Sequence, residues 1–161
     1  MNLADVKNGG ARAVTAFADQ HTLVAGAGTD NAEQNGAWVD RKGAAYGTVQ
    51  SAKLVITGEA TLAQGATLSI AANIQEATDA AGAGAADFGT ALASTVVATG
   101  DTGGSTEAFT AELDFDLSGA EQFIRSQITA DASASGTDTA TYTATWVFFG
   151  SDRNPISASL I

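Results

Sequence analysis

A strict two-residue alternation over residues 109–117 constrains the fold of this chain more than any other feature. Apolar side chains occupy the odd positions, and polar or acidic side chains occupy the even positions (Phe109, Ala111, Leu113, Phe115 and Leu117 against Thr110, Glu112, Asp114 and Asp116). Successive side chains of a β-strand point to opposite faces, so the pattern predicts a strand with one buried and one wet face. Strands of this kind are typical of antiparallel sheets that face water on one side.

Weaker versions of the same pattern recur along the chain, separated by turn signals. Strands are predicted over residues 52–57, 68–74, 92–99, 124–130 and 142–148. Gln64-Gly65, residues 100–104 and residues 133–136 have turn compositions, and residues 77–87 are expected to form a loop. No segment shows the alternating helices of a parallel α/β fold. The chain is therefore predicted to be all-β, an antiparallel, jelly-roll-like β-sandwich.

The first 50 residues do not show this regularity. Glycines interrupt them repeatedly, and their short apolar patches have no sustained period. We expect an irregular N-terminal arm over residues 1–20 and a single β-sandwich domain over residues 21–161. Two interpretations of the irregular region remain open: an arm that orders against a neighbour, or a long ordered loop packed on its own domain.

The chain contains no cysteine, so disulfides and thiolate metal sites are excluded. A domain of this length buries about 68–70% of its unfolded surface, which is enough for stability without covalent staples. Its longest apolar runs are far shorter than the ~18 residues of a membrane-spanning helix. The N-terminus also lacks the layout of a signal peptide. These features predict a soluble protein made in the cytoplasm.

Charge is distributed very unevenly along the chain. Five basic and five acidic residues precede Leu54, whereas only Arg125 and Arg153 oppose thirteen acidic residues after it, so the later part carries the net charge of −11. A body this acidic repels phosphate backbones and anionic lipids, so neither nucleic acid nor a membrane is expected as a partner. The acidic surface serves solubility, or the near-neutral N-terminal third faces a partner while the acidic remainder faces solvent.

Catalytic groups are scarce in this sequence. His21 is the only histidine, and no Gly-x-Ser-x-Gly elbow accompanies it. We predict no catalytic residue, cofactor or metal ligand, and we do not expect an enzyme.

The densest group of carboxylates is formed by Glu112, Asp114 and Asp116, which share one face of a predicted strand. Three such oxygen donors could bind Ca²⁺ or a glycan, or supply the carboxylate pair of a glycosidase. Alternatively they form a solvated strand face, with Arg125 on the next strand relieving their repulsion.

An ordered series of short segments resembles the capsid cement (decoration) proteins of tailed bacteriophages. The similarity extends roughly over residues 20–156 and rests on residues 51–56, 66–75, 87–89, 96–100, 113–120, 134–140 and 149–155. It implies a jelly-roll-like sandwich on the outer capsid surface of the virion, present as a symmetric homo-oligomer (a dimer or trimer). There the protein would bind the major capsid protein and stabilise the capsid lattice. The family brings no catalytic residues.

Contacts with protein partners are expected from the balanced-charge N-terminal region and from an aromatic residue near the C-terminus. The predicted contact residues are Lys7, Arg12, Phe17, Arg41, Lys42 and Phe149. The alternative functions are a carbohydrate-binding β-sandwich module and a phage tail or fibre component, with a glycosidase as a more distant third.

Overall fold

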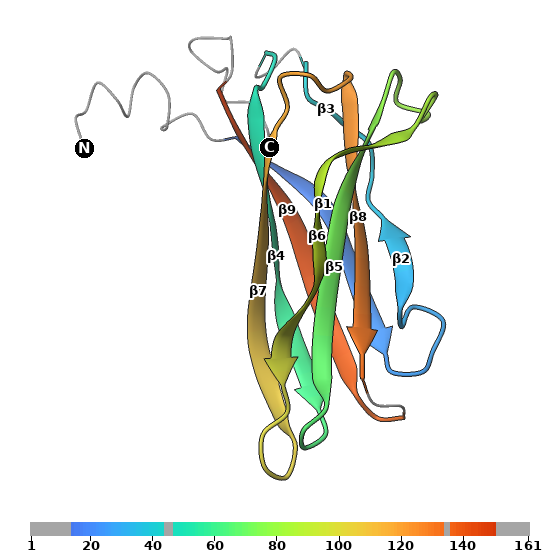
Figure 1. Cartoon of the computed structure of the whole chain (residues 1–161), viewed down its shortest axis with the longest axis vertical. Coiled ribbons are helices and arrows are strands. Elements are labelled where there is room, and N and C mark those ends of the chain that lie inside the picture. Colours follow the sequence, from blue (N-terminus) through green and yellow to red (C-terminus); the bar gives the residue numbers. More distant parts are fainter. Residues whose placement is uncertain (1–13, 44–46, 134–135, 151–161) are drawn as a thin grey trace, which may run out of the picture.

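A computed structural model describes residues 14–43, 47–133 and 136–150 as two antiparallel sheets packed face to face (Figure 1). One sheet, here called sheet A, has the order β1-β9-β4-β7, and sheet B has the order β2-β8-β5-β6, with β3 also paired to β8. The strands are β1 (Val14–Val24), β2 (Ala32–Asn35), β3 (Val39–Asp40), β4 (Ser51–Leu62), β5 (Thr67–Ala77), β6 (Ala86–Thr99), β7 (Ser105–Asp116), β8 (Phe123–Ala132) and β9 (Thr139–Phe149). Within these ranges, no helix has the length and apolarity needed to cross a membrane.

This architecture confirms the predicted all-β sandwich. Apart from the short β3 and the consecutive pair β5–β6 in sheet B, successive strands pass between the two sheets in the order of a jelly roll, so most neighbours within a sheet are distant in sequence. The alternation in residues 109–117 also holds: Phe109, Phe115 and Leu117 are buried, while Glu112 and Asp114 are exposed.

The core lies between the sheets and is built from the inward faces of β4, β5, β8 and β9. Trp146 and Phe148 of β9 are both fully buried, and their rings stack with centroids 5.9 Å apart. Phe115 approaches Trp146 from β7, with ring centroids 6.3 Å apart. These aromatic rings bridge the strands of sheet A and supply a large part of the apolar area removed from water.

The N-terminal region is more regular than the sequence indicates. β1 begins at Val14, so residues 14–20 pair with β9 and belong to the sandwich instead of to the predicted arm. The register of β1 against β9 shifts between Phe17 and Asp19. A bulge adds one residue to a strand and reverses the alternation beyond it, which explains why these residues look irregular in sequence. The structure therefore places residues 14–20 in sheet A.

β6 differs from its prediction for the same reason. It begins at Ala86, six residues before the predicted start, and its register against β5 shifts at three places. Each irregularity breaks the two-residue period, so only the last part of the strand could be recognised.

Gly58 allows three strands of sheet A to approach one another closely. A Cβ atom at this position would lie 2.2 Å from the carbonyl oxygen of Thr141 and 2.9 Å from the ring of Phe109. Because β4 pairs with β7 on one side and β9 on the other, the backbone has no room to move away. A glycine inside a strand marks such a close approach.

Candidate functional site

Four of the predicted contact residues lie in the described part of the chain, on β1, just after β3 and at the end of β9, and the β3 and β9 segments lie at the upper end of the sandwich in Figure 1. Phe149 lies at the end of β9, opposite Ser51, and its side chain is half-buried. Lys42 is exposed in the turn after β3. Phe17 lies on β1, paired with Thr145, whereas Lys7 and Arg12 lie outside the described residues. Residues 1–13 and 151–161 join the described chain at this same end, where Val14 pairs with Phe148.

Arg41 lies at this end too, but its side chain serves its own domain. It is buried, and its Nε donates to the carbonyl oxygen of Glu121 at 2.6 Å. Nη1 donates to the carbonyl oxygen of Val49 at 3.0 Å, and Nη2 donates to that of Ala120. Burial lowers the pKa of Arg41, while the charges of Glu76 and Glu121 act in the opposite direction. The structure thus makes Arg41 a clamp between the β3–β4 and β7–β8 connections.

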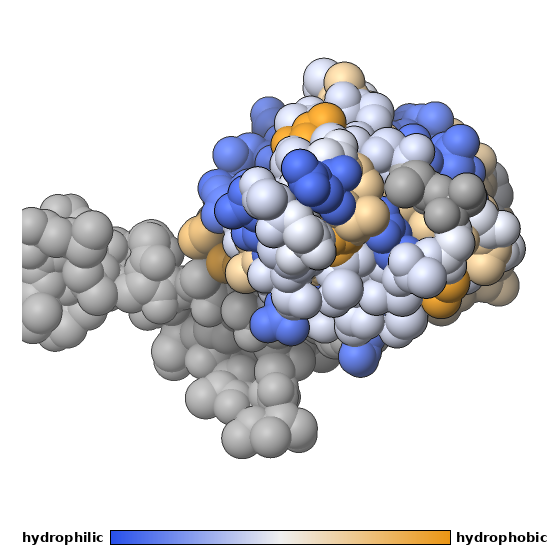
Figure 2. Space-filling model, turned by 90° about the horizontal axis from the view of Figure 1, so that it is seen from below, coloured by the Kyte–Doolittle hydropathy of each residue, from blue (hydrophilic) through white to orange (hydrophobic). Residues whose placement is uncertain are grey.

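The opposite end of the sandwich has no basic residue in its loops. In the part of the chain that the structure describes, these loops comprise residues 25–31, 63–66, 100–104, 133 and 136–138, and they contain Asp30, Asp101 and Asp138. Asp30 accepts hydrogen bonds from the backbone N–H groups of Gly26 and Ala132, and Asp138 accepts one from that of Ala63. Figure 2 shows this end, where hydrophilic side chains are scattered among side chains of intermediate hydropathy. Both ends of the sandwich therefore carry acidic side chains, since Asp79 and Glu121 are exposed in the loops at the end with Lys42, and the ends differ in that basic residues occur in the described loops of that end.

The carboxylates of Glu112 and Asp114 on β7 lie next to Lys53 of β4. The expectation that Arg125 would relieve their repulsion is wrong. Lys53 Nζ lies 2.5 Å from Glu112 Oε2 and 3.5 Å from Asp114 Oδ1. The hydrogen bond from Lys53 to Glu112 raises the pKa of the lysine. Asp116 accepts a hydrogen bond from the backbone N–H of Ser118, which lowers the pKa of its carboxyl.

Arg125 lies in the other sheet, on β8. Its Nε and Nη2 donate to Gln75 Oε1 at 3.0 and 2.7 Å, and its guanidinium sits 4.7 Å from the ring centroid of Trp38. Within the described ranges, no three His, Asp or Glu side chains are grouped closely enough to hold a metal ion. Sequence reasoning had no means of choosing between Lys53 and Arg125, because the partner strand of β7 is set by the topology.

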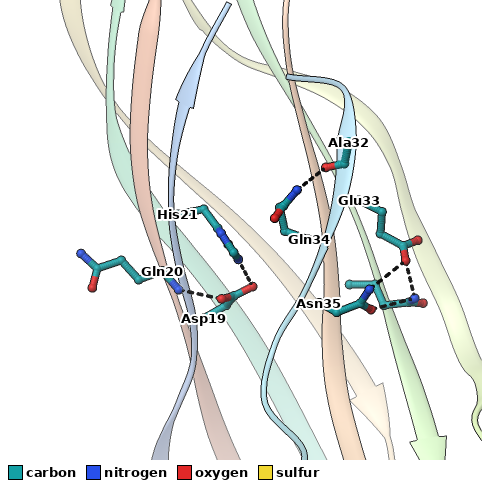
Figure 3. Close-up of polar contacts among 8 residues, drawn as sticks. Asp19, Gln20, His21, Ala32, Glu33, Gln34 and Asn35 are labelled. Carbon is teal, nitrogen blue, oxygen red and sulfur yellow. Dashed lines mark hydrogen bonds and ion pairs between the residues drawn. The ribbon is translucent and has the colours of Figure 1, made fainter. Parts of the chain in front are cut away.

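His21 lies on the edge strand β1 beside Asp19 and Gln20 (Figure 3). Its Nε2 lies 2.5 Å from Asp19 Oδ2, a contact that is an ion pair when the imidazole is protonated. The backbone N–H of Gln20 donates to the other carboxylate oxygen of Asp19. The His21 ring lies 5.7 Å from that of Tyr142.

This cluster does not have the arrangement of a Ser-His-Asp triad. A triad needs one imidazole nitrogen on the acid and the distal nitrogen free for the serine hydroxyl. Here Nε2, the distal nitrogen, faces Asp19. Ser126 lies on the facing strand β8, but it is fully buried and out of reach of a substrate. The geometry supports a structural role for these groups.

Tyr142 offers a test of that structural role. Its hydroxyl is buried and has no hydrogen-bond partner within the described part of the chain. Burial, assisted by the charge of Asp19, raises the pKa of Tyr142. A buried hydroxyl without a partner costs about 1–3 kcal/mol, so Tyr142→Phe is expected to raise the free energy of unfolding by about 1 kcal/mol. Urea denaturation measures this change, and a loss of stability in the variant would show that the hydroxyl is hydrogen-bonded.

Sheet B has a shallow hollow on its outer face, which the sequence did not reveal. Glu33, Ala71, Asn73, Ala91 and Gln127 are among its lining residues. Gln127 is buried and donates to Glu33 Oε1 at 2.7 Å and to Asn35 Oδ1 at 3.1 Å (Figure 3). This amide network depends on the pairing of β2 with β8, two segments nearly one hundred residues apart.

The glycan-binding alternative finds little support at this face. Sugar recognition on a sandwich commonly uses an exposed aromatic ring as a stacking platform. No aromatic residue lines the hollow among the described residues. Trp38, elsewhere in the chain, is half-buried, with Arg125 over its ring and Gly82 against it. The amides of the hollow already bond to one another.

Comparison with known proteins does not assign this chain to a family. No family model matches it, and no curated protein matches it. The solved structures that resemble it include the infectious bursal disease virus Gx strain, with TM-score 0.44 and 17% identity over 91% of this chain and 35% of that one. The VP2 subviral particle of the same virus gives TM-score 0.40 and 16% identity over 91% and 34%. The chain thus spans about a third of the length of these viral chains, and likeness at this level does not establish a shared function.

Proposed function

We propose that this protein is a capsid cement (decoration) protein of a tailed bacteriophage. It would bind the outside of the major-capsid lattice as a symmetric homo-oligomer and hold neighbouring capsid subunits together. The observation that carries the proposal is the difference between the two ends of the sandwich in their basic residues and chain termini. Lys42, Phe149 and the junctions with residues 1–13 and 151–161 lie at one end, while the loops of the opposite end contain acidic residues and no basic ones.

This difference suits a protein that stands on a surface. The end that carries Lys42 and Phe149 would face the capsid, where a cationic and an apolar group complement a mixed protein surface. The end with Asp30 and Asp101, which has no basic residue in its described loops, would face solvent, where like charges keep neighbouring particles apart. The sequence resemblance to cement proteins over residues 20–156 agrees with this orientation.

Attachment would depend on many weak contacts. A rigid sandwich that engages two capsid subunits at once converts its second contact into an intramolecular one. Affinity can then exceed that of a single contact by about 10²–10⁴ without any new interaction. Such a protein needs no deep pocket, which fits the shallow hollows on this surface.

The proposal is tested by co-sedimentation of the purified protein with phage capsids that lack it. We expect saturable binding at a copy number set by icosahedral symmetry. Binding to isolated tails or fibres, with none to capsids, would support the tail or fibre alternative. A rise in melting temperature with Ca²⁺ or oligosaccharides, in the absence of capsid binding, would support the glycan-binding alternative.

Deletion of residues 1–13 should separate attachment from folding. Because β1 begins at Val14, this truncation leaves the sandwich intact, and its melting temperature should match that of the full chain. We expect its affinity for capsids to fall roughly tenfold or more, since multivalent attachment amplifies the loss at each site.

Deletion of residues 1–20 is the matched comparison, because it removes seven residues of β1 and should also lower the melting temperature. Equal capsid affinity of the full chain and the variant without residues 1–13 would show that this segment does not contact the capsid.

A further inference from the structure

Residues 89–97 of β6 form an exposed strip on an edge of sheet B, here called the β6 strip. Most of its side chains are exposed, with only Leu92 and Val97 half-buried. Val96 is 55% exposed, the highest value among the large apolar residues that the structure describes. The strip contains no charged residue, although the chain has a net charge of −11. Exposed apolar surface of this kind marks an interaction site more often than a solubilising face.

The strip is suited to side-chain packing and poorly suited to extending the sheet. β6 pairs with β5 on one side only, and three irregularities interrupt that register. A bulged edge cannot present a continuous row of backbone donors and acceptors to a new strand. Val96 pairs with Ser69, so it shares the outer face of sheet B, where its side chain is available to a partner.

Directly beside the strip, the outer face of β5 is uncharged over residues 69–73, and the charged residue beyond it is Asp131 of β8, which pairs with Ser69. Ser69, Ala71 and Asn73 of β5 are half-buried and, from the register, share the outer face with Val96. Ala71 and Ala91 line the shallow hollow that joins the strip to the rest of this face. The carboxylate at the rim of the hollow, Glu33, accepts hydrogen bonds from Gln127 and Asn35.

The distribution of charged residues indicates which kind of partner binds the β6 strip. A basic partner would select the acidic loops, or the outer face of sheet A with its exposed Glu112 and Asp114. Two copies of this chain, in contrast, repel each other over those same surfaces. They approach most easily where each copy carries the least charge, and the β6 strip, which has no charged residue, meets that condition. Small side chains such as Ala91 and Ala93 allow close approach of two such surfaces.

We propose that the β6 strip is the surface on which a second copy of this chain docks. This inference specifies the contact within the homo-oligomer of the proposed function, but it does not depend on capsid binding. The contact buries Val96 and the neighbouring small residues of β6 against their counterparts. Since net repulsion opposes it, association should tighten as salt screens the charges.

Sedimentation velocity over a range of protein and salt concentrations tests the inference. The wild type should be an oligomer, and Val96→Asp should weaken association at least tenfold, because it adds a negative charge to the contact of an already acidic protein. Val24→Asp is the matched control, since Val24 is also exposed, at 41%, and the change of charge is the same. It should leave the association unchanged. Circular dichroism establishes that each variant is folded, and Ala93→Asp replaces Val96→Asp if the latter is not.

The outcomes separate this inference from the proposed function. A wild type that is monomeric at all concentrations but binds capsids overturns the inference alone. The same holds if Val96→Asp associates as the wild type does, or if Val24→Asp dissociates equally. An oligomer that is lost in Val96→Asp but never binds capsids supports the inference and contradicts the cement function.

Discussion

Replacing Arg41 with methionine is expected to lower the free energy of unfolding by about 3 kcal/mol. The guanidinium is buried and donates hydrogen bonds to the carbonyl oxygens of Glu121, Val49 and Ala120. Methionine fills a similar volume but leaves these three acceptors without a donor, and each unsatisfied buried group costs about 1–3 kcal/mol. For a domain of this size the melting temperature should fall by roughly 6–12 °C. Calorimetry and urea denaturation measure both quantities.

Two variants show whether the effect comes from the buried hydrogen bonds. Lys42→Met removes the neighbouring, exposed charge and should change stability by less than about 0.5 kcal/mol. Arg41→Lys keeps the charge but cannot reproduce the forked donor geometry, so an intermediate loss is expected. If Arg41→Met were as stable as the wild type, the hydrogen bonds of Arg41 would not hold the two connections together. The prediction that Arg41 contacts a partner would then be open again.

Trp146→Ala is expected to cost about 3–5 kcal/mol, the range for removal of a large aromatic side chain from a core. Trp146 is completely buried and contacts the rings of both Phe115 and Phe148. Its removal leaves a cavity. The rings of Phe115 and Phe148 cannot fill it, because they are held in place by β7 and β9. Urea denaturation should show the loss as a lower midpoint with an unchanged slope.

Phe149→Ala supplies the control, since Phe149 lies on the same strand but on the opposite face and is half-buried. It should cost much less stability than Trp146→Ala. If Phe149 contacts the capsid as proposed, the same variant should bind capsids more weakly while it remains folded. A core-sized loss of stability in Phe149→Ala would contradict this division between the two faces of β9.

The surfaces proposed for the capsid, for a second copy and for solvent lie on different parts of the molecule. The end with Lys42 and Phe149 is assigned to the capsid, the β6 strip to a second copy, and the acidic loops to solvent. An oligomer formed through β6 would multiply the number of capsid-facing ends. Each weak contact with the capsid would then be reinforced by the others.

The regular strands could be predicted from the sequence because their signal is local. Residues 109–117 alternate without interruption, and β9 alternates equally well over Tyr142, Ala144, Trp146 and Phe148. One buried and one wet face follow directly from the two-residue repeat of a strand. The absence of any competing helical period then predicted an all-β sandwich.

Strands with bulges could not be predicted in this way. The register shift between Phe17 and Asp19 in β1, and the three shifts in β6, reverse the alternation within a few residues. These segments therefore lack a regular two-residue alternation in the sequence, and for this reason the predicted arm extends to residue 20. The bulges are stabilised by the neighbouring strands, β9 for β1 and β5 for β6. β9 is remote in sequence from β1, whereas β5 directly precedes β6, so in β6 the irregular register alone hides the strand.

The sequence by itself therefore determined the class of fold, the inward residues of the regular strands and the excess of acidic charge. Only the tertiary structure decided which strands became neighbours, and with that the partners of individual side chains. It placed Lys53 next to Glu112, buried Arg41 with its Nε on the carbonyl oxygen of Glu121, and brought Gln127 within hydrogen-bonding distance of Glu33. The physical reason is that alternation depends on two adjacent residues, whereas the jelly-roll order brings together strands from opposite ends of the chain.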